Sequence, residues 1–115
     1  MSLQKACDIK SLIKNNSVVI EFYGELIENS IGELSQRYQE LDKKQKQSLI
    51  IDLSHVQYIN SAGISLIINL LKEQQKLSKK LKIAGLSDYF KKLFKALGID
   101  EYIEFYKNSS AATMS

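Results

Sequence analysis

Ser61 is the residue of this chain whose surroundings most favour chemistry. It follows an apolar stretch at residues 49–53 and stands where a long apolar-periodic segment begins, which predicts a helix N-terminus. The first N–H groups of a helix lack intrahelical partners, and the helix dipole favours negative charge there. A phosphate on Ser61 would therefore be tolerated by the fold while changing the surface offered to a partner. The plainer alternative is that Ser61 only caps the helix, and the two roles are compatible.

Asp52, Ser54, His55 and Ser61 also have the residue types of a Ser-His-Asp triad. The strained turn of a hydrolase nucleophile needs glycine two residues before the serine, and Ile59 holds that place. His55 directly follows Ser54 and is too close in sequence to serve as its base. We therefore predict no catalytic residue and no enzymatic activity. We expect Asp52 at the end of its strand instead, where it would accept backbone N–H bonds near Ser61.

Composition excludes several other classes of function. One histidine, one cysteine and scattered carboxylates show no metal-ligand spacing, and the five glycines are isolated, so neither a metal nor a phosphate-loop cofactor is predicted. The net charge is only +3, and Arg37 is the single arginine among 16 basic residues, which disfavours direct nucleic-acid binding. No apolar run approaches the ~20 residues of a membrane span. The start lacks a signal-peptide core, and Cys7 has no intramolecular partner, so we expect a cytoplasmic protein.

The hydrophobic periodicity predicts a single α/β domain with helices packed on a mixed sheet. Helices are expected from Ser30, where Ser30 and Glu33 have capping-box spacing, from Ser61 to Leu77, and from Ser87 or Asp88 to Leu97. The expected strands are residues 9–14, 17–23, 48–53, 81–84 and 102–106. The domain is predicted to cover residues 1–106, and the small, polar residues 107–115 are predicted to be a disordered tail.

Four fragments, in this order and spacing, resemble the STAS domain and in particular bacterial anti-sigma factor antagonists. They are Tyr23-Gly-Glu-Leu26, Ile51-Asp-Leu-Ser-His-Val56, Ile59-Asn-Ser-Ala-Gly63 and Leu97-Gly-Ile-Asp100. The resemblance extends from about Ile9 to Tyr106 and implies a STAS-type single domain.

The same resemblance implies a function and a set of partners. Ser61 matches the serine that is phosphorylated in the family. An anti-sigma factor with serine-kinase activity would phosphorylate it, and a phosphatase would reverse the reaction. The unphosphorylated form would sequester the anti-sigma factor, so the domain itself would need no catalytic group. The predicted switch and partner-binding residues are Asp52, Ser54, Asn60, Ser61, Ala62 and Gly63.

The chain departs from the family pattern at three positions. Asn60 stands where the family usually has aspartate, Ile27 replaces the aspartate that often follows Gly-Glu-Leu, and Ala62 replaces a second serine. These departures also fit STAS proteins with other partners. The alternative function is therefore a non-switching STAS subunit of a stressosome-like assembly or of a lipid-transport ABC complex.

Overall fold

Five strands form one mixed sheet in the order β1-β2-β3-β4-β5 in the computed structural model, which describes residues 7–114. The strands are β1 (Cys7–Lys14), β2 (Ser17–Leu26), β3 (Leu49–Ile59), β4 (Leu81–Ala84) and β5 (Ile103–Tyr106). The helices are α1 (Glu28–Glu40), α2 (Lys43–Gln47), α3 (Ser61–Lys76), α4 (Asp88–Ala96) and α5 (Ser109–Thr113), with a 3₁₀ turn at Asp100–Tyr102. The predicted α/β domain with a mixed sheet is confirmed.

The sheet begins with a hairpin and continues in parallel strands. β1 and β2 are antiparallel and joined by Asn15 and Asn16, whose φ angles of 50° and 67° are the left-handed values that a two-residue hairpin turn requires. β2 pairs with β3, β3 with β4 and β4 with β5, each time in parallel. A connection that contains at least one helix leads into each of β3, β4 and β5. The carboxyl ends of β2 and β3 therefore meet at the same edge of the sheet.

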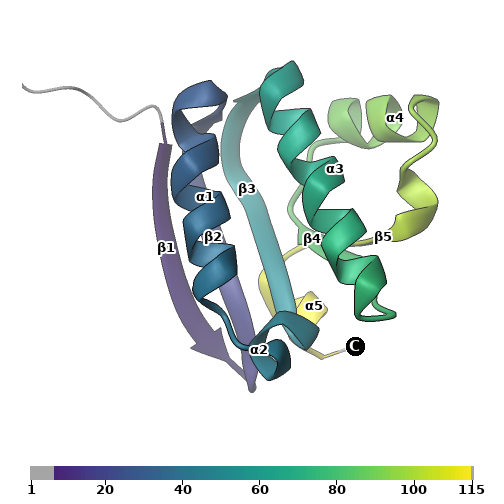
Figure 1. The fold of residues 1–115 in the computed structure, drawn as a ribbon. Helices are drawn as coiled ribbons and strands as arrows, with labels where there is room; N and C mark the ends of the chain where they lie inside the picture. Colours follow the sequence, from purple (N-terminus) through teal and green to yellow (C-terminus); the bar gives the residue numbers. More distant parts are fainter. Residues whose placement is uncertain (1–6, 115) are drawn as a thin grey trace, which may run out of the picture.

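Helices α1 and α3 cover one face of the sheet, and the main core lies beneath them (Figure 1). Each helix turns a stripe of apolar residues inward, including Leu34 and Tyr38 of α1 and Leu66 and Leu70 of α3. The largest fully buried side chains are Phe22, Phe94, Ile20, Leu26, Leu34, Leu49, Ile50, Ile51, Leu53, Ile67, Leu81 and Ile83. This core holds the start of α3 firmly against the ends of β2 and β3.

The opposite face carries α5, which lies where a disordered tail was predicted. Residues 107–114 are described, so the expectation of disorder is wrong for them. The Asn108 side chain accepts a hydrogen bond from the Ala111 N–H at 2.8 Å and so caps the helix. Ala112 is fully buried beside Val19 and Ile50. Small residues are typical of a disordered tail, which is why the sequence predicted one. In the structure, their small size lets the helix approach the sheet closely.

Two element boundaries differ from the predictions. Helix α1 begins at Glu28, and Ser30 occupies its third position, where the Ser30 hydroxyl accepts from the Ile27 N–H and donates to the Glu25 carbonyl. Strand β3 continues beyond residue 53 to Ile59, because β2 keeps pairing with it across two register shifts. This second half of the strand carries exposed polar residues, so a prediction based on apolar runs ended the strand too early.

Candidate functional site

The start of α3 is capped by Asn60, not by Ser61. Asn60 has an extended backbone, and its side-chain oxygen accepts a hydrogen bond from the Gly63 N–H at 3.1 Å. Ser61 is the first helical residue, and its side chain is exposed. Its hydroxyl has no hydrogen-bond partner among residues 7–114, so the alternative role of Ser61 as a plain cap is wrong. The hydroxyl is free to react.

Asn60 also ties the start of α3 to two neighbouring elements. Its Nδ2 donates to Glu28 Oε1 at 2.8 Å, and Glu28 is the first residue of α1. Its backbone N–H donates to the Leu26 carbonyl at the end of β2, at 3.3 Å. Three chain segments therefore converge on Asn60, and together they hold the adjacent Ser61 in place.

Gly63 lets α3 approach the end of β2 more closely than any other residue would. It is buried, and a Cβ built on it would overlap the Leu26 carbonyl oxygen and lie 2.9 Å from Ile59 Cγ2. The first turn of α3 therefore presses Gly63 inward while Ser61, two residues earlier, faces solvent. This packing explains why a glycine follows the serine at that spacing.

The surface around Ser61 suits a phosphate group in part. The N–H groups of Ser61 and Ala62 belong to the first turn of α3 and cannot bond within the helix, and no acceptor for them lies within the described chain. Ala62 is half-buried and adds no hydroxyl. Glu28 places a carboxylate on the neighbouring helix. Free N–H groups favour a phosphate here, while Glu28 opposes it.

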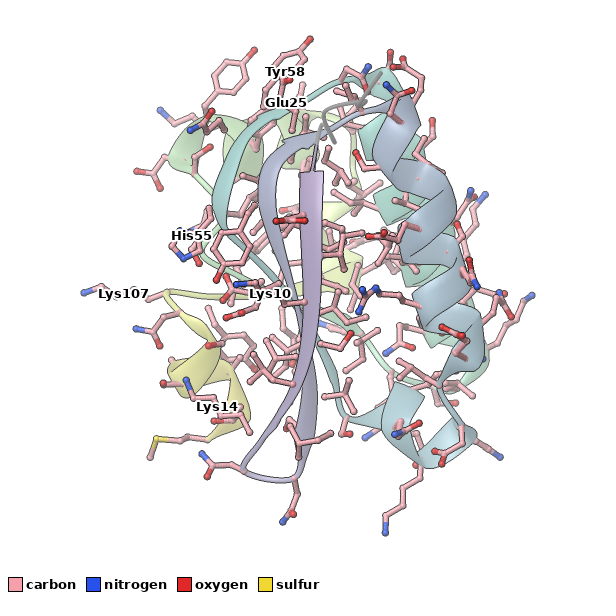
Figure 2. All side chains as sticks on the ribbon, turned by 90° about the vertical axis from the view of Figure 1, so that its left-hand side faces the viewer. Lys10, Lys14, Glu25, His55, Tyr58 and Lys107 are labelled. Carbon is pink, nitrogen blue, oxygen red and sulfur yellow. The ribbon has the colours of Figure 1, made fainter. Side chains whose placement is uncertain are left out.

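Tyr58 belongs to the same end of the molecule, although the sequence reasoning missed it. It pairs with Glu25 across β2 and β3, and its side chain is 50% exposed. In Figure 2, Tyr58 and Glu25 lie at the end of the sheet toward which β3 runs before α3 begins. Tyrosine is among the residue types enriched at protein interfaces.

Comparison with known proteins identifies the family. Residues 8–112 match the model of the STAS domain. The chain belongs to the STAS domain family. The "Anti-sigma-B factor antagonist" of Staphylococcus aureus (strain NCTC 8325 / PS 47) is 24% identical over 94 residues, which cover 82% of this chain and 87% of the relative.

Solved STAS structures share the fold at lower identity. A putative anti-sigma factor antagonist from Thermotoga maritima superposes with a TM-score of 0.79 at 18% identity, covering 92% of each chain. The Bacillus cell fate determinant SpoIIAA in its phosphorylated form gives a TM-score of 0.60 at 17% identity, covering 92% of this chain and 96% of that one. These likenesses establish the architecture of the STAS domain described above.

Asp52 and Ser54 lie away from this site, contrary to the prediction that Asp52 ends its strand near Ser61. Asp52 is only 5% exposed, and its Oδ1 accepts from both the Ser54 N–H, at 2.9 Å, and the Ser54 hydroxyl. Strand β3 continues from Asp52 to Ile59, a path of about 23 Å at the usual rise per residue. A Cβ at Gly85 would overlap Ser54, so this cluster fixes where β3 and β4 part.

His55 stacks on Tyr23 and does not approach Ser61. Their ring centroids are 4.5 Å apart with an interplanar angle of 11°, and Lys10 Nζ lies 5.2 Å from the Tyr23 ring (Figure 2). Partial desolvation, together with the Glu21 carboxylate that accepts from the Tyr23 hydroxyl at 3.2 Å, raises the pKa of Tyr23. The stack forms on the sheet face opposite α1 and α3. The triad geometry is therefore absent.

Two further observations concern the described residues of the STAS domain. Between residues 7 and 114, no group of three or more His, Cys, Asp or Glu side chains could hold a metal ion. Within the same part of the chain, no helix has the length and apolar character needed to cross a bilayer.

Proposed function

We propose that this STAS domain is an anti-sigma factor antagonist that is switched off by phosphorylation of Ser61. The observation that carries the proposal is the exposed, unbonded Ser61 hydroxyl at the first position of α3, beside a cap supplied by Asn60. The hydroxyl can be modified without loss of any hydrogen bond that holds the fold. A serine that served as the cap would not have that freedom.

The related proteins support the same proposed function. The Staphylococcus aureus relative is named an antagonist of an anti-sigma-B factor, and SpoIIAA has been solved in phosphorylated and unphosphorylated forms. Carried to this chain, the partner is an anti-sigma factor with serine-kinase activity, and a phosphatase resets the switch in the cytoplasm.

In the unphosphorylated state, the uncharged residues Asn60, Ser61 and Ala62 form a surface that an anti-sigma factor covers, beside the Glu28 carboxylate and with Tyr58 at its margin. The kinase transfers the γ-phosphoryl group of ATP to Ser61 Oγ: the hydroxyl proton is lost, the O–P bond forms and ADP leaves. The product carries about −1.5 to −2 charges. Covering that charge requires its desolvation against a partner surface shaped for a hydroxyl, so the complex dissociates.

The test uses the cognate kinase, ATP and mass spectrometry. Phosphate is expected on Ser61, and Ser61→Ala should abolish incorporation. Ser65→Ala is the matched control, because Ser65 is also exposed on α3, one turn later, and its loss should change nothing. Phosphate on Ser54 or Ser65 in place of Ser61 would overturn the assignment.

A measurement of partner binding distinguishes the phosphorylation switch from the alternative function without a switch. The unphosphorylated chain should bind the anti-sigma factor, and the phosphorylated chain should bind it far more weakly. A chain that binds no anti-sigma factor and accepts no phosphate would instead fit a structural subunit of a larger signalling or transport complex.

A further inference from the structure

Among residues 7–114, the outer edge of β1 is the longer of the two sheet edges that no other strand covers. β1 and β5 are the edge strands, with 8 and 4 residues respectively. β1 pairs with β2 along its whole length without a register shift, so its outer edge is regular. Regular strand edges present a row of N–H and C=O groups that another strand can pair with, and proteins usually interrupt them with bulges or proline.

The hairpin turn determines which residues present those groups. A two-residue turn makes Lys14 and Ser17 a hydrogen-bonded pair, and the bonding then alternates along an antiparallel ladder. Ile9, Ser11 and Ile13 therefore turn their N–H and C=O groups away from β2. Within the described chain, no strand pairs with that side and no turn or loop hydrogen bond engages these backbone groups.

We propose that a second copy of this chain pairs with this edge, antiparallel, about a two-fold axis at Ser11. In that register, Ser11 lies opposite Ser11 of the second copy. Ile9 lies opposite Ile13 of the second copy, and Asp8 lies opposite its Lys14. Each facing pair among the outward residues closes two main-chain hydrogen bonds. The result is one continuous sheet across two molecules. The proposal does not depend on phosphorylation of Ser61.

Charge selects this register over its neighbours. With the axis at Ser11, Asp8 of each copy lies opposite Lys14 of the other, an attractive cross-strand pair that occurs twice. An axis at Lys10 would place Lys10 against itself. An axis at Leu12 would place Lys10 against Lys14. Both alternatives oppose like charges and are unfavourable.

The exposed side chains of β1 fit the same arrangement. Ile13 is 65% exposed, and pairing would bring it against Ile9 of the second copy. Lys10, which would otherwise discourage edge pairing, lies over the Tyr23 ring. Figure 2 views β1 edge-on, with α1 on one side and α5 on the other, and neither covers the edge.

One contact opposes the pairing. Arg37 Nη1 donates to Ser11 Oγ at 3.0 Å, so the two-fold axis brings the Arg37 side chains of both copies toward each other. A short strand edge with this repulsion fits a dimer that dissociates on dilution, in contrast to an obligate one.

A charge swap tests the proposal by sedimentation velocity over a range of protein concentrations. The parent chain should dimerise as concentration rises. Lys14→Asp and Asp8→Lys should each weaken the dimer by about tenfold, because each replaces two attractive pairs with repulsive ones. Lys14→Asp also removes the hydrogen bond from Lys14 Nζ to Ser109 Oγ, so Asp8→Lys is the cleaner of the two variants. The double variant restores opposite charges and should recover the dimer. Lys92→Asp makes the same charge change as Lys14→Asp on the exposed side of α4 and should have no effect.

Backbone readouts guard against an indirect effect on folding. Ser11→Pro removes an outward N–H and leaves the ladder with β2 intact, so it should abolish dimerisation with little change in melting temperature. Amide exchange at Ile9, Ser11 and Ile13 should slow as concentration rises, while Lys10 and Leu12, already bonded to β2, stay unchanged.

Three results would overturn the proposal. They are a chain that stays monomeric at all concentrations, a dimer that ignores the charge swap, and protection of the outward amides only when a different protein is added.

Discussion

Asn60 Nδ2 donates to Glu28 Oε1 at 2.8 Å, and this bond joins the first turns of α3 and α1. The Asn60 amide accepts from the Gly63 N–H and at the same time donates to a carboxylate, which an ionised aspartate cannot do. An aspartate at this position, as the family pattern has it, would cap the helix equally well but would face Glu28 with a second negative charge. Asn60 and Glu28 therefore form a matched pair, and the departure from the pattern has a structural reason.

Asn60→Asp should accordingly lower the free energy of unfolding by about 1–2 kcal/mol at neutral pH, since a charge-assisted hydrogen bond becomes a repulsion. Urea unfolding of the variant and of the parent chain at neutral pH measures it. Glu28→Gln combined with Asn60→Asp removes the repulsion and should restore stability. If the double variant were as unstable as the single one, the pairing would not explain Asn60.

Ser61→Ala should change the free energy of unfolding by less than about 0.5 kcal/mol, because the Ser61 hydroxyl is exposed and bonds to no described residue. Asn60→Ala, one residue earlier, should cost about 0.5–2 kcal/mol through loss of the cap. Denaturant titration of both variants under identical conditions compares them. A larger loss at Ser61 than at Asn60 would contradict the assignment of the cap.

The sequence alone was sufficient for much of the architecture and for the position of Ser61. The Asn15-Asn16 turn and the apolar stripe of α3 are local signals, so the hairpin and the helix were predictable. The exchange of roles between Asn60 and Ser61 was not predictable, since both residue types cap helices well. Tertiary contacts, such as the packing of Gly63 on the Leu26 carbonyl and the hydrogen bond from the Asn60 N–H to the same carbonyl, fix where the helix begins.

The predicted position of Asp52 was wrong for a different reason. A strand prediction based on apolar runs ends where polar residues begin, and Asp52 stands near that point. Strand β3 instead continues because β2 offers a long partner, a property of the pairing and not of the strand itself. The positions of side chains that depend on where a strand ends could therefore not be predicted from the sequence.

Gly63→Ala should be the most damaging substitution at the site. The added Cβ meets a backbone carbonyl that cannot rotate away, so a loss of about 1–3 kcal/mol is expected, as for overpacked cores. Gly32→Ala in α1 is the matched control, because nothing lies within 4 Å of a Cβ there. Alanine favours helix at that position by up to about 1 kcal/mol. Thermal melting should therefore move in opposite directions for the two variants.

Tyr38→Phe tests a buried polar link between the two helices of the main layer. The Tyr38 hydroxyl donates to Gln74 Oε1 at 3.0 Å, and Gln74, which is 1% exposed, donates to the Lys46 carbonyl at 2.9 Å. Phenylalanine leaves the Gln74 oxygen unpaired and should cost about 1–3 kcal/mol.

The same residue predicts a dependence on pH. Burial, and then the Glu73 carboxylate, raise the pKa of Tyr38 above its ordinary value of 10.0. A raised folded-state pKa gives stability that is complete below pH 10 and is lost as the pH rises through the folded-state value. The fall in unfolding free energy above pH 10 should therefore be shallower in Tyr38→Phe than in the parent. Parallel curves would show that Tyr38 contributes nothing to it.

Ala112→Asp asks whether α5 is an integral part of the domain. Ala112 is fully buried against Val19 and Ile50, whereas Ala111 is exposed. A carboxylate at residue 112 must either stay unsolvated or detach α5, and detachment is the less costly outcome. Lys14 and Asn15 each donate one hydrogen bond to α5, at Ser109 and Thr113, and the expected loss is about 1–3 kcal/mol. Limited proteolysis should then cut the variant near residue 107, while Ala111→Asp stays resistant. Equal resistance of the two variants would mean that α5 stays bound without Ala112.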